Sequence, residues 1–190
     1  MNSKIEFKIN GVVPLLMHNG QLANPRNEIV KAIKEITSNR KKTDADLVEL
    51  MHLEFMGGLY LNSEGKIVIP GESVEAMLKA GATKKKLGKA FTAGVICDGE
   101  WILDYDGPKD PEKLFLDENF VFTRPAKVCK ARIMRTRAIF RRWSLSFVVH
   151  FNDQVVNRKD VIDAAITAGS LSGLGDWRPK FGRFEVEDMK

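Results

Sequence analysis

Residues 143–151 alternate strictly between large apolar side chains and smaller or polar ones, and this pattern constrains the fold more than any other in the chain. Because successive side chains of a β-strand point to opposite faces, the alternation predicts a strand with one buried face. Such a strand needs neighbouring strands and a second layer over its apolar face. The apolar face is formed by Trp143, Leu145, Phe147, Val149 and Phe151.

The segments after this strand predict a helix and a final strand. Asn157 is a typical N-cap residue, and apolar side chains follow it at helical spacing from Val161 to Ala168. Residues 183–187 alternate again and predict the last strand, with Phe184 facing inward. The end of the chain therefore predicts a β-α-β unit.

The beginning of the chain also predicts a strand followed by helices. Residues 4–10 alternate as a half-buried strand, and apolar spacing predicts a helix over about 26–38. Thr43 and Asp46 form a variant capping box at the start of a second helix. The buried side of that second helix is expected to carry Leu47, Leu50, Met51 and Phe55.

The middle of the chain contains shorter elements. A strand at 66–69 leads through Pro70 and Gly71 into a third helix. Short strands at 95–96 and 101–103 are expected to form a hairpin around Asp98-Gly99. The buried face of the third helix is expected to carry Val74, Met77, Leu78 and Gly81.

The element order predicts an α+β fold with a ferredoxin-like or RRM-like antiparallel sheet and helices on one face, because strand–helix–strand units stand at both ends of the chain. The length of 190 residues suits one domain over 1–190. Insertions are expected at about 20–58, which is helical, and at about 104–142, which is a basic loop or hairpin.

Positive charge is concentrated in one segment. The chain has a net charge of +5, and residues 127–142 contain no acidic side chain. Such a positive surface attracts polyanions, although a solvated charged face would leave the same pattern. We expect an extended hairpin or loop that orders on its ligand. Its basic residues are Lys127, Lys130, Arg132, Arg135, Arg137, Arg141 and Arg142.

The sequence lacks the signatures of several function classes. No apolar run is long enough to span a membrane, and no zincin, Cys-x-x-Cys, Walker or Rossmann pattern occurs. No metal or cofactor is therefore expected. Cys97 and Cys129 are isolated, which is typical of free thiols in a reducing cytoplasm. The first residues lack the features of a signal peptide, so a cytoplasmic location is expected.

A glycine-rich segment near the end, residues 173–184, is the second candidate for contact with a phosphate chain. Glycine has no Cβ and lets backbone come close to a phosphate, which basic side chains neutralise. Trp177 is the better candidate for stacking on a base, whereas Trp143 belongs to the alternating strand and is expected to be buried. The expected contacts in this segment are Gly173, Gly175, Trp177, Arg178, Lys180 and Arg183.

Three segments together resemble the RAMP superfamily of CRISPR-associated proteins, most closely the backbone subunits of effector complexes. They are the strand before Pro14-Leu15-Leu16-Met17, the turn-helix at 69–79, and the glycine-rich segment. Glu72, Ala76 and Lys79 depart from the usual residues of the turn-helix. The resemblance implies an RRM-like fold, binding of guide RNA along its backbone, contact with other subunits, and side-by-side assembly of copies. It adds Ser73, Lys79, His18 and Asn19 to the expected RNA contacts.

The chain offers few groups for chemistry. His18 is the one histidine suited to general acid–base work, since His52 is expected to be structural and His150 lies on a polar strand face. Asp44 and Asp46 are explained by the helix cap. We therefore expect a non-catalytic protein that binds RNA, or another single-stranded nucleic acid. Two alternatives remain open: a RAMP endoribonuclease that processes guide RNA, and a viral or mobile-element assembly or inhibitor protein with the same fold.

Overall fold

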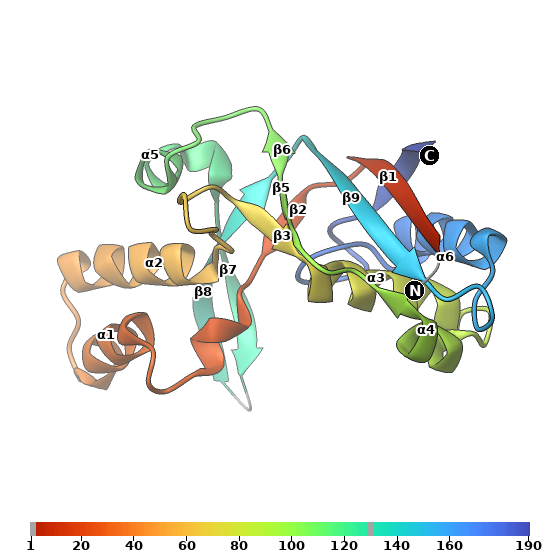
Figure 1. Ribbon diagram of the computed structural model, residues 1–190. Coiled ribbons are helices and arrows are strands. Elements are labelled where there is room, and N and C mark those ends of the chain that lie inside the picture. Colours follow the sequence, from red (N-terminus) through yellow and green to blue (C-terminus); the bar gives the residue numbers. More distant parts are fainter. Residues whose placement is uncertain (1–2, 129–130) are drawn as a thin grey trace.

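The main sheet has the ferredoxin-like strand order. The computed structural model describes residues 3–128 and 131–190, and its largest sheet is antiparallel in the order β10-β1-β9-β4. Helix α3 lies between β1 and β4 in the chain, and α6 lies between β9 and β10 (Figure 1). This β-α-β-β-α-β order confirms the predicted α+β fold. The bounds are β1 Ser3–Gly11, α3 Gly71–Thr83, β4 Val95–Ile96, β9 Trp143–Phe151, α6 Arg158–Leu171 and β10 Phe184–Met189.

The core beneath this sheet follows the sequence pattern closely. The alternating side chains of β9 are all buried, including Trp143, which is 4% exposed. The expected face of α3 is buried as well, and it joins one continuous core with β1, β9 and α6. Burial of these two layers against each other is the main stabilising contribution to such a domain.

A second, smaller sheet is built from segments outside these six elements. Its order is β2-β8-β7, and helices α1 and α2 lie beside it in the left half of Figure 1. The segment between β1 and α3 holds β2 Leu15–Met17, η1 Gly20–Ala23, α1 Glu28–Ser38, α2 Asp44–Gly58 and β3 Val68–Pro70. The segment between β4 and β9 holds β5 Glu100–Ile102, β6 Asp104–Tyr105, α5 Pro111–Leu116, η2 Glu118–Phe120, β7 Val121–Val128 and β8 Ala131–Phe140. The remaining helix, α4, spans Gly88–Gly94.

Local signals at helix starts are confirmed. The Thr43 side chain accepts from the Asp46 backbone N–H, and the Asp46 carboxylate accepts from the Thr43 N–H at 2.8 Å. Asn157 caps α6 through the N–H of Asp160. The buried side of α2 was predicted less well: Phe55 is fully buried, but Leu47 is 46% exposed.

The predicted hairpin around Asp98-Gly99 is wrong. Strand β4 pairs with β9, and β5 pairs with β3, so the two short strands do not pair with each other. The partners supplied by distant strands outweigh the local turn signal. The basic segment, by contrast, does form an extended hairpin, because β8 pairs with β7 along its length.

Two further observations concern membrane spans and thiols. None of the helices in the described part of the chain is long and apolar enough to cross a membrane. Cys97 is buried, and burial together with the nearby Glu75 carboxylate raises the pKa of its thiol to about 12. Cys129 lies outside the described residues.

Candidate nucleic-acid interface

Three neighbouring hollows share lining residues from one to the next. The hairpin hollow, of about 420 Å³, lies between β8 and α1 and is lined by Arg135, Arg137 and His18, among others. The middle hollow, of about 260 Å³, shares His18 with it and is also lined by Ser73 and Arg178. The helix-end hollow is an open groove of about 570 Å³ beside the last residues of α3 and α6. We call this chain of hollows the track.

The glycine-rich segment joins the middle and helix-end hollows. Gly175, Asp176 and Arg178 line both. Gly175 has a φ of +80°, and a Cβ placed there would lie 2.4 Å from the backbone oxygen of Leu16. Only glycine therefore lets the loop lie this close to β2. The neighbouring N–H of Asp176 donates to the same Leu16 oxygen at 2.8 Å, which fixes the floor of the track.

Glu54 anchors the hairpin to helix α2. Its side chain is only 5% exposed, accepts the backbone N–H of Thr136 at 2.8 Å, and forms an ion pair with Arg135. A buried carboxylate needs such partners, because an unpaired charge away from water is strongly unfavourable. The charge of Arg135, one side chain of the predicted positive segment, is thus compensated by a buried carboxylate.

Arg137 ties the same hairpin to the glycine-rich loop. Its Nε donates to the Asp176 carboxylate at 2.6 Å, and its guanidinium carbon lies 5.8 Å from the ring centroid of Trp177. Its Nη1 is buried and has no hydrogen-bond partner among the described residues. The Asp176 carboxylate of the glycine-rich loop is therefore paired with a side chain of β8.

Trp177 belongs to an aromatic cluster at the edge of the track. Its ring stacks on Phe181 with centroids 5.9 Å apart, and Phe122 of β7 packs edge-on against both rings. The side chain remains 41% exposed, and its φ of +56° is uncommon for a residue with a Cβ. Protein groups therefore cover part of the ring that was expected to stack on a base.

His18 stands where the hairpin and middle hollows meet. Burial is the main cause that lowers its pKa below the ordinary value of 6.5, and the nearby guanidinium groups of Arg137 and Arg135 lower it further. The Asp176 carboxylate acts in the opposite direction. The imidazole is therefore neutral near pH 7, with one nitrogen that donates and one that accepts.

The structure brings together part of the expected contact set. The predicted residues that line the track are His18, Ser73, Arg135, Arg137, Gly175, Trp177 and Arg178. Lys127 and Arg132 are cross-strand neighbours near the end of the hairpin, and Arg132 is exposed. Lys130 lies outside the described residues.

Other expected contacts have partners elsewhere. Asn19 caps η1 and donates to Leu59 O. Lys79 lines a fourth hollow, which lies beside the middle one and shares Glu72 and Ala76 with it. Gly173 already donates its N–H to Ala168 O at 2.7 Å, so this amide is engaged inside the protein.

The remaining basic side chains fall into two places. Arg141 and Arg142 line a hollow beside Asp106 that shares no residue with the track. Arg183 donates to Pro179 O across the loop, and Lys180 is exposed beside Phe181.

Sequence reasoning missed several residues of the track. Glu54 could have been found from the sequence, because it is an acidic residue between the apolar Leu53 and Phe55. Lys84, which lines the helix-end hollow, was visible only as part of a lysine run. The apolar wall of the hairpin hollow depends on long-range packing and gave no local signal; it consists of Leu22, Ala23, Val30 and Ile33.

No group of three or more His, Cys, Asp or Glu side chains within residues 3–128 and 131–190 is placed to hold a metal ion.

Comparison with known proteins gives a likeness among solved structures. No protein-family model matches the sequence, and no curated protein matches it. Among solved structures, a chain in the cryo-EM structure of the Type III-B Cmr-beta bound to cognate target RNA is similar, with a TM-score of 0.53 and 12% sequence identity. The alignment covers 98% of this chain and 59% of that chain, so this protein spans about three-fifths of the length of its neighbour. At such low identity the likeness establishes the fold.

Proposed function

We propose that this protein binds single-stranded RNA along the track, as a non-catalytic subunit of a CRISPR-type ribonucleoprotein complex. Guide RNA is the proposed ligand, held through its backbone. Further copies of the chain and other subunits are the proposed neighbours. The observation that carries the proposal is the succession of three neighbouring hollows, of which the first two share His18 and the last two share Arg178 as lining residues.

The charges along the track favour phosphate contact at its ends. Arg178 and Lys84 are exposed around the helix-end hollow, and neither side chain forms an ion pair within the described residues. Arg132 is exposed near the end of the hairpin. Exposed cations of this kind neutralise phosphates without losing an internal partner, and they give binding that weakens steeply with salt.

The fold supports the same proposal. The neighbour belongs to a complex that is bound to target RNA, and the present chain has the sheet order and the inserted hairpin on which a RAMP-type subunit would present its RNA surface. Membership of the RAMP superfamily is part of the proposal.

A salt titration with matched variants tests the proposal. We expect the protein to bind an unstructured RNA of about 30 nucleotides at low salt, with log K falling by about 0.7 per phosphate contact for each log unit of salt. Lys84→Ala/Arg178→Ala should weaken binding and reduce that slope by up to about 1.4, which is two contacts at 0.7 each.

The control variant is Lys66→Ala/Arg142→Ala, which removes the same charge from exposed residues outside the track. It should bind nearly as tightly as the wild type. Equal losses in the two variants, or no binding at low salt, would contradict the proposal.

One observation favours a second function for the same site. His18 is neutral near pH 7 at the junction of two hollows, so it could accept a proton from a ribose 2′-hydroxyl. An endoribonuclease of this kind would lose cleavage in His18→Ala while retaining RNA binding. Full cleavage by His18→Ala would exclude the role.

A further inference from the structure

We propose that Glu72 accepts a hydrogen bond from a ribose 2′-hydroxyl in the middle hollow, and that this contact makes the protein prefer RNA to chains that lack the hydroxyl. The inference rests on the proposed RNA binding and adds the residue that recognises the sugar. The 2′-hydroxyl is the group by which a protein distinguishes RNA from DNA at a given site. Glu72 departs from the usual residue of the turn-helix, so the contact is a property of this chain.

Two opposite charges in the lining of the middle hollow do not meet. Glu72 lies in the first turn of α3 and Arg178 in the glycine-rich segment, and both residues are exposed. Neither side chain forms an ion pair within residues 3–128 and 131–190. An occupant of the hollow can therefore present an anionic group to Arg178 and a hydrogen-bond donor to Glu72.

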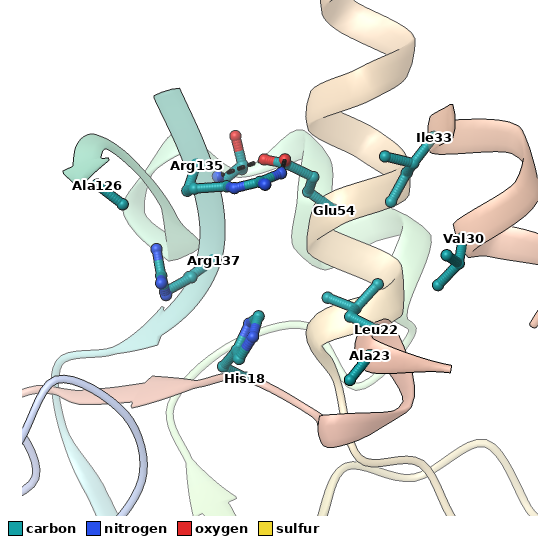
Figure 2. A pocket seen from close by; sticks show the side chains of 10 residues that line it. His18, Leu22, Ala23, Val30, Ile33, Glu54, Ala126, Arg135 and Arg137 are labelled. Carbon is teal, nitrogen blue, oxygen red and sulfur yellow. Dashed lines mark hydrogen bonds and ion pairs between the residues drawn. The ribbon is translucent and has the colours of Figure 1, made fainter. Parts of the chain in front are cut away.

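Other polar side chains of this hollow are engaged inside the protein. The Asp176 carboxylate accepts from Arg137 Nε at 2.6 Å, and the Tyr60 hydroxyl donates to the backbone oxygen of His18 at 3.3 Å. Figure 2 shows the imidazole of His18 projecting into the hairpin hollow, on the side of Arg137. The carboxylate of Glu72 is thus the anionic acceptor of the middle hollow that remains available to a ligand.

One nucleotide of RNA carries both groups that this hollow requires, because a phosphate and a 2′-hydroxyl are attached to the same sugar. The phosphate suits Arg178, and the hydroxyl donates to the Glu72 carboxylate in a charge-assisted hydrogen bond. A deoxyribose leaves that carboxylate close to the phosphate chain with repulsion alone. The volume, about 260 Å³, lies below the range of about 300–1,000 Å³ for drug-sized ligands and suits a sugar better than a whole nucleoside.

Binding to RNA and to 2′-fluoro RNA tests the inference. The two ligands have the same unstructured sequence of about 30 nucleotides and are compared at one low salt concentration. Fluorine replaces the hydroxyl donor and leaves the charge of the chain unchanged. The wild type should bind RNA about fivefold more tightly than 2′-fluoro RNA, which is what one hydrogen bond to an exposed acceptor contributes.

The decisive variant is Glu72→Ala, which should reduce this preference to within about twofold. Loss of the negative charge strengthens the binding of both ligands alike, so the ratio of the two affinities isolates the hydroxyl contact. Glu72→Gln keeps a neutral acceptor and should retain an intermediate preference.

The matched control is Glu35→Ala, which removes the same charge from an exposed position of α1 that lines none of the three hollows. It should keep the fivefold preference. Binding of 2′-fluoro RNA by each variant also establishes that the variant is folded.

Two outcomes would overturn the inference alone: equal wild-type affinity for the two ligands, or a fivefold preference for RNA in Glu72→Ala. Failure of the wild type to bind either ligand would instead remove the proposed RNA binding, and the ribose contact with it.

Discussion

Glu54 links helix α2 to the basic hairpin, and its substitution should change stability and RNA affinity in opposite directions. The carboxylate is almost fully buried and has two partners, the Thr136 N–H and the Arg135 guanidinium. Glu54→Ala removes both interactions. Glu54→Gln keeps an oxygen that can accept the Thr136 N–H, but it leaves Arg135 without a counter-charge.

The size of the stability loss follows from these partners. Thr136 is 3% exposed, so its N–H left without an acceptor costs about 1–3 kcal/mol. Arg135 keeps 35% of its side chain in contact with solvent, so water replaces part of the lost ion pair and the second contribution is about 1 kcal/mol. We expect Glu54→Ala to lower the free energy of unfolding by about 2–4 kcal/mol, and Glu54→Gln by about half as much.

Thermal and urea unfolding measure the effect. The melting temperature of Glu54→Ala should fall by about 5–15 °C for a chain of this size, whereas the exposed Glu49→Ala on the same helix should melt within about 2 °C of the wild type. The uncompensated Arg135 should raise the low-salt RNA affinity of Glu54→Gln by about fivefold, and added salt should remove the gain. A wild-type melting temperature for Glu54→Ala would mean that the contacts of Glu54 with Thr136 and Arg135 do not stabilise the fold.

Three other predictions concern the glycine-rich segment, the buried thiol and His18. A Cβ at Gly182 would lie 1.7 Å from a backbone oxygen of the same segment, so Gly182→Ala should prevent folding or lower the free energy of unfolding by at least about 3 kcal/mol. Gly65 has a similar φ but lies in open space, so Gly65→Ala should lower it by only about 1 kcal/mol. Equal losses in denaturant unfolding would contradict the predicted clash. Because the pKa of the Cys97 thiol is raised to about 12, a Cys129→Ser protein should not react with a thiol reagent at about pH 8 until it is unfolded; rapid reaction of the native protein would contradict this. Burial lowers the pKa of His18, so the folded state disfavours the proton that the unfolded state binds. The free energy of unfolding should therefore decline as the pH falls below 6.5, and it should decline less in His18→Gln. An NMR titration that places the pKa at or above 6.5 would contradict this.

Local sequence signals predicted the framework of the fold. The alternation at 143–151 gave β9, the Thr43–Asp46 capping box gave the start of α2, and the apolar spacing after Gly71 gave α3. Each of these signals depends on side chains within a few residues of one another. That is why single-sequence reasoning recovered them.

Pairings between distant segments were beyond such reasoning. An Asp-Gly pair between two short strands favours a hairpin locally, yet β3 and β9 supply better partners for those strands. Arg137 counted as one more positive charge in the sequence, but its carboxylate partner, Asp176, lies 39 residues further along the chain. The sequence therefore overestimated the positive charge of the track, because Arg135 and Arg137 are paired with carboxylates. It also did not predict the apolar wall of the hairpin hollow.

Ultraviolet cross-linking of the protein to RNA, followed by mass spectrometry of the linked peptides, locates the RNA on the protein directly. If RNA binds along the track, links should fall within the segments that line it, especially around His18, Ser73 and Trp177. Links confined to the hollow beside Asp106 and Arg142, or no links under conditions in which the RNA remains bound, would contradict it.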